Sequence, residues 1–171
     1  FDRIALPAAA TTDVETAQCS YKGGNAPRDA VTRRIGSMQL DGGCLCGAVR
    51  YRATLPIVDS GYCHCRACRR ASGAPVVTWF SLKAEQLSIL KGTARTFHSS
   101  AKGRRDFCPD CGTQLFFRGE HAELVDVTNA SLDDPNQVAP EYHIWRAGKI
   151  TWFETTDALP RHDDAGPDWR A

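Results

Sequence analysis

The segment 107-FCPDCGT-113 places Cys108 and Cys111 on either side of a proline and an aspartate. A tight turn of this kind brings two thiolates together, and Gly112 tolerates the backbone conformation that such turns often require. The pattern is typical of a zinc knuckle. Because a knuckle supplies only two ligands, it needs a second pair from elsewhere in the chain.

The pair Cys44 and Cys46, separated by one leucine, can supply the missing ligands. Residues i and i+2 of an extended strand face the same side, so we expect both sulfurs to aim at one point. Together with Cys108 and Cys111 they would complete a closed tetrahedral zinc site. The alternative is a set of reduced core thiols without metal. Pairing with two of the cysteines at 63–68 instead would leave the knuckle without partners.

The segment 61-GYCHCRACRR-70 then holds three further cysteines. Cys63 and Cys65 share one face of an extended segment, and a turn can bring Cys68 back beside them. Three protein thiolates would leave one position of a zinc ion open for water or substrate. The geometry therefore favours an open zinc site at Cys63, Cys65 and Cys68.

Two other interpretations of this triad stay open. A fourth ligand such as His64, His98 or His143 would close the site, and the pair Cys65 and Cys68 would suit a redox dithiol. His64 lies between two residues that face the same side, so we expect it to point away and to pack rather than to bind metal.

The bulk properties narrow the class of protein. The chain has 171 residues and a net charge of +1, from 21 basic and 20 acidic residues. This balance gives no electrostatic signature for nucleic acid or for an anionic membrane. No apolar run is long enough to span a bilayer, and the apolar patch at residues 4–10 lacks a secretory pattern. We expect a soluble, cytoplasmic protein without nucleic-acid or membrane partners.

The grouping of the eight cysteines argues against disulfides. Close-spaced thiols in a chain without a secretion signal indicate metal binding or redox chemistry. Cys19 stands apart from the clusters, and we expect it to have no part in the site.

The chain divides into three parts. Residues 1–38 show no sustained period of two or 3.6 and end at Met38, the only methionine. We expect them to form an irregular extension, an added leader or mis-started segment rather than a native arm. Residues 39–160 should form the zinc domain, and residues 161–171 a polar tail.

Within residues 39–160, short β-branched and aromatic runs are punctuated by Gly and Pro. We expect an all-β domain of mostly antiparallel strands, with helical turns only near 66–71 and 83–86. The predicted strands cover 48–53, 75–80, 87–91, 94–98, 104–107, 114–118, 123–128 and 142–145.

The ordered motifs resemble the family of glutathione-dependent formaldehyde-activating enzymes, which also includes centromere protein V. The likeness covers about residues 40–160 and includes seven cysteines in order, which makes it specific. It rests on 43-GCLCG-47, 63-CHCRACRR-70, 107-FCPDCGT-113, 129-NASLDDP-135, 142-YHIW-145, Trp152 and 157-DALP-160.

The resemblance implies an Mss4-like β-tent fold around two zinc ions per chain. It implies a structural site and a catalytic site, and carbon–sulfur lyase chemistry that makes or breaks S-(hydroxymethyl)glutathione from glutathione and formaldehyde. A thiol such as glutathione and an aldehyde would then be the partners. The structural ligands would be Cys44, Cys46, Cys108 and Cys111, and the catalytic ones Cys63, Cys65 and Cys68.

Two rival functions remain: a zinc-stabilised protein-binding module without catalysis, and a thiol redox protein.

The residues around the triad have two interpretations each. Arginines 66, 69 and 70 would offset the anionic site or hold substrate carboxylates, or form a solvated basic turn. We expect the aromatic residues to be core. These are Trp79, Phe80, Phe116 and Phe117. The resemblance makes His143 and Trp145 candidates for a pocket wall, although packing is the simpler account.

Overall fold

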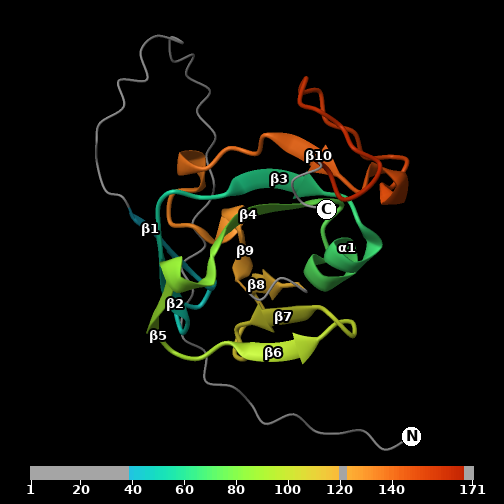
Figure 1. Cartoon of the computed structure of the whole chain (residues 1–171). Helices are drawn as coiled ribbons and strands as arrows, with labels where there is room; N and C mark the ends of the chain where they lie inside the picture. The colour runs from blue at the N-terminus through green and yellow to red at the C-terminus, as the bar shows by residue number, and fades with distance from the viewer. Residues whose placement is uncertain (1–38, 120–122, 168–171) are drawn as a thin grey trace, which may run out of the picture. The chain divides into compact units, whose positions relative to one another are not determined.

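A computed structural model of the protein describes residues 39–119 and 123–167 (Figure 1). The expected N-terminal extension and Cys19 lie outside these residues. Within them, no helix is long and apolar enough to cross a membrane.

The described part of the chain is built from ten short strands and one short helix. The helix α1 spans Arg66–Ser72 and ends at Gly73. The strands are β1 (Gln39–Gly43), β2 (Arg50–Thr54), β3 (Asp59–Cys63), β4 (Val77–Lys83), β5 (Leu87–Lys91), β6 (Arg95–His98), β7 (Arg104–Phe107), β8 (Gln114–Arg118), β9 (Leu124–Thr128) and β10 (Tyr142–Ile144). Single 3-10 turns are η1 (Ala84–Gln86), η2 (Asn129–Ser131), η3 (Pro135–Gln137) and η4 (Arg146–Gly148).

The strands form two open sheets (Figure 1). One has the order β1-β2-β5, and the other has the order β10-β3-β4-β9-β8-β7-β6. All pairs of these strands are antiparallel except β10 with β3. The expected fold class, all-β with short, mostly antiparallel strands and little helix, is confirmed.

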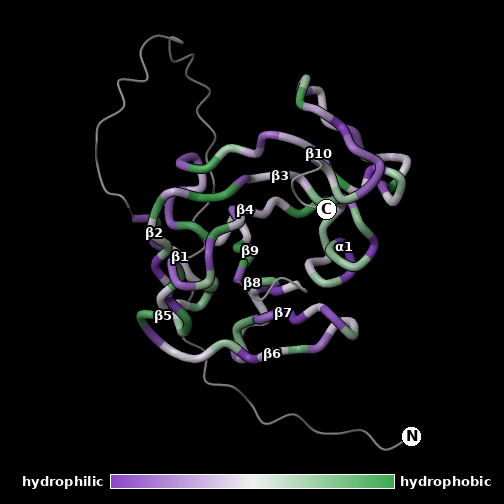
Figure 2. The backbone as a smooth tube through the Cα atoms, in the orientation of Figure 1, coloured by the Kyte–Doolittle hydropathy of each residue, from purple (hydrophilic) through white to green (hydrophobic). Residues whose placement is uncertain are grey.

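The main core cluster contains buried residues from both sheets. β2 alternates between buried and partly exposed residues, while most of β4 is buried. Figure 2 shows polar and apolar stretches alternating along the tube, as expected of strands that each bury one face. The largest fully buried side chains are Tyr51, Phe80, Phe116, Leu82 and Leu115.

Two strands, β1 and β3, were not predicted from the sequence. β1 contains adjacent glycines, and β3 begins with aspartate and serine, so neither has the apolar β-branched composition that the prediction relied on. Asp59 and Ser60 of β3 are nevertheless buried. Sheet pairing with β4 and β10, rather than local propensity, makes this segment a strand.

Residues 161–164 lie beside β10. His143 donates its backbone N–H to Pro160 and accepts one from His162, while Trp145 donates to Asp164. This pairing fixes the outer edge of the large sheet, next to the strand end that carries Cys63.

Candidate functional site

Four cysteines from two distant turns meet in one cluster. Their Sγ atoms all lie within 4.8 Å of one another. The Sγ of Cys46 lies 3.5 Å from that of Cys44 and 3.7 Å from that of Cys108. Cys111 completes the group. This is the donor set of a closed site with four sulfur ligands, which zinc prefers.

Both turns close in a similar way. Gly47 donates its N–H to the carbonyl of Cys44 at 3.0 Å, and Gly112 donates to Cys108 at 2.9 Å. Both glycines are left-handed, with φ of 72° and 75°. The prediction that Cys44 and Cys46 lie on an extended strand is wrong, because β1 ends at Gly43. Their sulfurs converge because the chain turns, and not through strand alternation.

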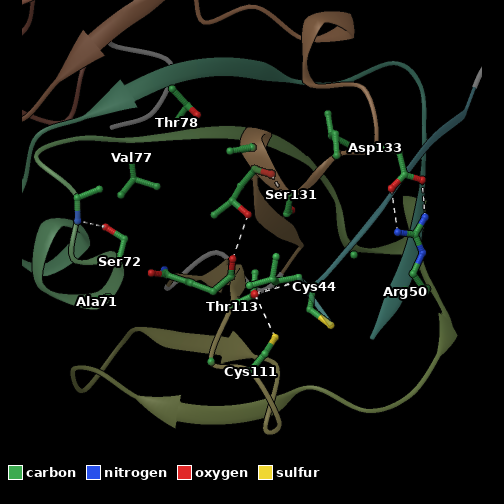
Figure 3. Close-up of a pocket in the computed structure, with 18 of the residues that line it drawn as sticks. Cys44, Arg50, Ala71, Ser72, Val77, Thr78, Cys111, Thr113, Ser131 and Asp133 are labelled. Carbon is green, nitrogen blue, oxygen red and sulfur yellow. Dashed lines mark hydrogen bonds and ion pairs between the residues drawn. The ribbon is translucent and has the colours of Figure 1, made fainter. Parts of the chain in front are cut away.

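Thr113 links the two turns. Its Oγ1 accepts the backbone N–H of Leu45 at 3.1 Å and lies 3.2 Å from the Sγ of Cys111 (Figure 3). The hydrogen bond from Thr113, together with backbone N–H groups of Thr113 and Cys46, lowers the pKa of Cys111 to about 5, which favours the thiolate that a metal needs. On the other side, the N–H of Val49 donates to the Sγ of Cys44 at 3.2 Å.

The remaining three cysteines form a second cluster at the junction of β3 and α1. Cys63 is the last residue of β3, Cys65 is the N-cap of α1, and Cys68 lies in the helix. Their Sγ atoms also lie within 4.8 Å of one another. Cys65 keeps an extended backbone, so its sulfur accepts the N–H of Cys68 at 3.3 Å while facing the Sγ of Cys63.

Three thiols at this distance cannot all ionise without a cation. Hydrogen bonds from the thiols of Cys63 and Cys68 strongly lower the pKa of Cys65. The thiol of Cys63, which donates to Cys65 and Cys68 and is buried, has a raised pKa. Like charges in contact disfavour further ionisation, and a divalent cation removes that repulsion. The donor set therefore fits a metal held by three sulfurs.

No histidine joins either cysteine cluster among the described residues. His64 points away from the triad, as predicted, and its Nε2 lies 2.9 Å from Nδ1 of His143. The Nε2 of His143 in turn lies 3.0 Å from a carboxylate oxygen of Asp157. His98 lies on β6 and is exposed. The described residues thus give no support to a triad closed by histidine.

The arginines next to the triad have separate roles. Arg69 donates to the carbonyls of His64 and Gly148 at 3.1 and 2.8 Å, so it holds the loop rather than the site. Arg66 and Arg70 are exposed. The arginine that contacts the triad is Arg105, whose Nη2 donates to the Sγ of Cys68 at 3.5 Å.

The sequence analysis missed Arg105. It lies on β7, far from the triad in the chain, and is only 7% exposed. Its position inside a predicted strand could have identified it, because an arginine that is buried in a sheet needs a partner for its charge.

A cavity of about 100 Å³ lies directly beside Cys63. Trp79, Phe117 and Trp145 help to line it, together with Tyr142. Trp145 is therefore a pocket wall, while His143 is not among the lining residues. Trp79 and Phe117 were expected to be core only, but they also face this cavity. Phe80 and Phe116 are core residues.

Trp145 has a left-handed backbone, with φ of 57°. No other residue except glycine does so in the part of the chain that the structure describes. This conformation is costly for a bulky residue and is often found at functional sites. It sets the Trp145 side chain against the cavity beside Cys63.

A larger cavity of about 750 Å³ lies beside the four-cysteine cluster (Figure 3). Cys44, Cys111 and Thr113 line one part of it, and Ala71 and Ser72 at the end of α1 line another. At its edge, Arg50 donates to Asp133 at 2.8 Å, in an ion pair that ties β2 to the segment after η2.

Comparison with known proteins identifies the family. Residues 39–148 match the profile of the glutathione-dependent formaldehyde-activating enzyme family. The chain belongs to this family. The match contains both cysteine clusters and Arg105.

The similarity to individual proteins is moderate. A Halomonas elongata protein named "Putative glutathione-dependent formaldehyde-activating enzyme" is 31% identical over 128 residues, which cover 68% of this chain and 81% of that protein. An "Uncharacterized lyase" of Schizosaccharomyces pombe is 29% identical over 94 residues, covering 55% and 68%. A crystal structure of a Rhodobacter sphaeroides protein has a TM-score of 0.48 and 26% identity, covering 57% of this chain and 93% of that one.

Proposed function

We propose that this protein is a zinc-dependent carbon–sulfur lyase that makes or breaks the adduct of a thiol and an aldehyde, with glutathione and formaldehyde as the substrates. The observation that carries the proposal is the cluster of three cysteines without a fourth protein ligand among the described residues. Membership of the family and the names of the two relatives support the same reaction class.

We propose different roles for the two clusters. Cys44, Cys46, Cys108 and Cys111 would hold a structural zinc, because four sulfurs satisfy its tetrahedral preference. Cys63, Cys65 and Cys68 would hold the catalytic zinc. When bound there, zinc would offer a fourth position to a substrate thiol and lower its pKa, which supplies the thiolate.

The chain itself contributes charge and enclosure around that position. Three thiolates and one divalent cation leave a net negative charge, which the guanidinium of Arg105 offsets through its contact with Cys68. The cavity beside Cys63, with its mostly apolar and aromatic lining, offers a space of about 100 Å³ for a small aldehyde. In the forward direction the substrate thiolate adds to the carbonyl carbon, the C=O bond becomes a C–O single bond, and its oxygen takes a proton to give the hemithioacetal.

The test combines metal content with activity. Wild type should contain two zinc ions per chain and should accelerate formaldehyde consumption when glutathione is present. Cys65→Ser should contain one zinc ion and lose the acceleration, yet remain folded, because serine is itself a favoured helix N-cap. Wild-type protein with two zinc ions and no acceleration would rule out these substrates.

The redox alternative has a separate signature. The sequence predicted Cys65 and Cys68 as the redox pair, but the Sγ atoms of Cys63 and Cys68 lie 3.5 Å apart, so oxidation without metal could join these two as well. If zinc-loaded protein undergoes reversible thiol oxidation at the triad in a glutathione redox buffer, the lyase proposal loses its basis. Protection of all three thiols from alkylation by bound zinc would support it.

A further inference from the structure

A cavity of about 690 Å³ is lined by residues of α1, β6 and β7 and by the start of β8. Figure 1 shows α1 on the side of the large sheet where these strands lie. Arg70 lines it from the helix, Phe97 and Arg105 from β6 and β7, and Gln114 from the start of β8. None of the described residues that line it is acidic. The groove is therefore cationic and partly aromatic.

Two side chains of this groove carry polar atoms without a hydrogen-bond partner. The Nη1 of Arg105 and both amide atoms of Gln114 are buried and have no hydrogen-bond partner among the described residues. A buried guanidinium or amide without partners costs free energy, so such a group calls for a partner such as a ligand or an ordered water. Arg105 is only 7% exposed, so water has little access to its unpaired N–H groups. This low exposure strengthens the case that they bind a ligand.

The guanidinium of Arg105 is fixed in place from two sides. Its Cζ lies 4.8 Å from the centre of the Phe117 ring, and its Nη2 donates to the Sγ of Cys68. Phe97 and Phe117 are its direct neighbours across the sheet. A guanidinium held in this way presents its remaining edge without further loss of side-chain entropy.

We infer that this groove binds a carboxylate of the thiol substrate. The carboxylate accepts hydrogen bonds from Nη1 of Arg105 and Nε2 of Gln114, with Arg70 adding positive charge from α1. Because Arg105 lines the groove and contacts Cys68, the proposed ligand lies next to the triad. That the ligand is a thiol rests on the function proposed above; that it carries a carboxylate rests on the groove alone.

The groove therefore selects among thiols. A thiol with a carboxylate, such as glutathione, gains charge-assisted hydrogen bonds that a neutral thiol lacks. A neutral thiol would leave the buried groups of Arg105 and Gln114 without partners. Sites built in this way discriminate strongly against ligands that lack the matching polar group.

Binding without chemistry tests the inference. The probes are S-methylglutathione, whose sulfur is blocked, and its diethyl ester, whose carboxylates are also blocked. Their dissociation constants are measured by calorimetry on the zinc-loaded full chain, without formaldehyde. The acid should bind about tenfold more tightly than the ester, as expected for a hydrogen bond to a charged group.

Three variants locate the contact. Arg70→Ala and Gln114→Leu should each weaken binding of the acid about threefold to tenfold and leave the ester unchanged. Arg105→Lys should weaken it more, since lysine keeps the charge but loses the planar fork. Zinc content and thermal melting establish that this variant is intact. If it does not fold, Arg70→Ala and Gln114→Leu decide the question.

Arg104→Ala is the matched control, because Arg104 is the exposed neighbour on β7 and does not line the groove. It should bind both probes as wild type does. Equal affinity for acid and ester, or no effect of Arg70→Ala and Gln114→Leu, would overturn the inference. Tighter binding of the acid in a protein that does not consume formaldehyde would refute the proposed function alone. Formaldehyde consumption with equal affinities would refute the groove alone.

Discussion

His64, the first residue after β3, faces His143 of the neighbouring strand β10, with 2.9 Å between Nε2 of His64 and Nδ1 of His143. In the tautomer with its proton on Nε2, His143 donates to Asp157 at 3.0 Å and its Nδ1 is the acceptor. His64 then donates through its Nε2, and its buried Nδ1 has no hydrogen-bond partner among the described residues. These contacts hold the segment between Cys63 and Cys65 in place on the side opposite to the cysteine sulfurs.

Removing Asp157 should loosen that segment. We expect Asp157→Ala to lower the free energy of unfolding by about 1–3 kcal/mol, since a buried N–H of His143 loses its acceptor. Asp157→Asn should cost less, because an amide oxygen can still accept. Zinc at the triad should be released more readily in Asp157→Ala, while the second zinc is unaffected. Urea unfolding and competition with a chelator measure the two effects.

Asp163→Ala provides the control for this series. Asp163 is exposed in the same part of the chain. Its replacement should change the free energy of unfolding by less than about 0.5 kcal/mol. A similar loss in both alanine variants would mean that the hydrogen bond to His143 is not the cause.

Chelation should remove the two zinc ions in sequence. The triad offers three sulfurs and an open position, which a chelator can occupy, whereas four sulfurs fill the other site. We expect zinc release to show a fast and a slow phase of equal size when followed with a chromogenic chelator. Cys65→Ser should show only the slow phase. A single phase for wild type would contradict the division into an open and a closed site.

Gly61→Ala should destabilise the fold beside the triad. A Cβ at Gly61 would lie 2.5 Å from the Tyr142 ring, which is buried and also lines the cavity next to Cys63. Overpacking of this kind costs about 1–3 kcal/mol. Thermal melting of the zinc-loaded protein measures the loss. Gly119→Ala is the control, because its new Cβ would lie 3.6 Å from the nearest atom of the described residues, so its Tm should match wild type. Equal melting of the two variants would refute the packing argument.

Tyr51 should make stability depend on alkaline pH. Burial of its hydroxyl raises the pKa of Tyr51 above its ordinary value of 10. A raised pKa means that the folded state disfavours the phenolate, so this contribution is complete below pH 10 and is lost as the pH rises further. Wild type should therefore lose stability above pH 10 more steeply than Tyr51→Phe.

The same variant should behave differently at neutral pH. Tyr51→Phe loses the hydrogen bond of 2.7 Å to Ser131, so it should be less stable than wild type by about 0.5–1.5 kcal/mol at pH 7. The difference should shrink or reverse above pH 10. Chemical unfolding at a series of pH values measures it, and a constant difference from pH 7 to pH 11 would contradict the prediction.

The spacing of the cysteines by itself determined much of the site. A knuckle such as Cys108 to Cys111 has ligands that are close in the chain, so sequence alone indicates its geometry. The same holds for the triad, where α1 begins at the predicted turn and brings Cys68 back to Cys63. Most strands were also predictable, because their β-branched and aromatic residues are local signals.

Tertiary structure decided which distant groups meet. Arg105 reaches Cys68 only because β7 lies across the cavity from α1, and His143 reaches His64 only because β10 pairs with β3. Local sequence patterns do not predict such contacts, since strand pairing joins segments that are far apart in the chain. The sequence therefore determined the candidate metal ligands, and the fold decided which charges and side chains surround them.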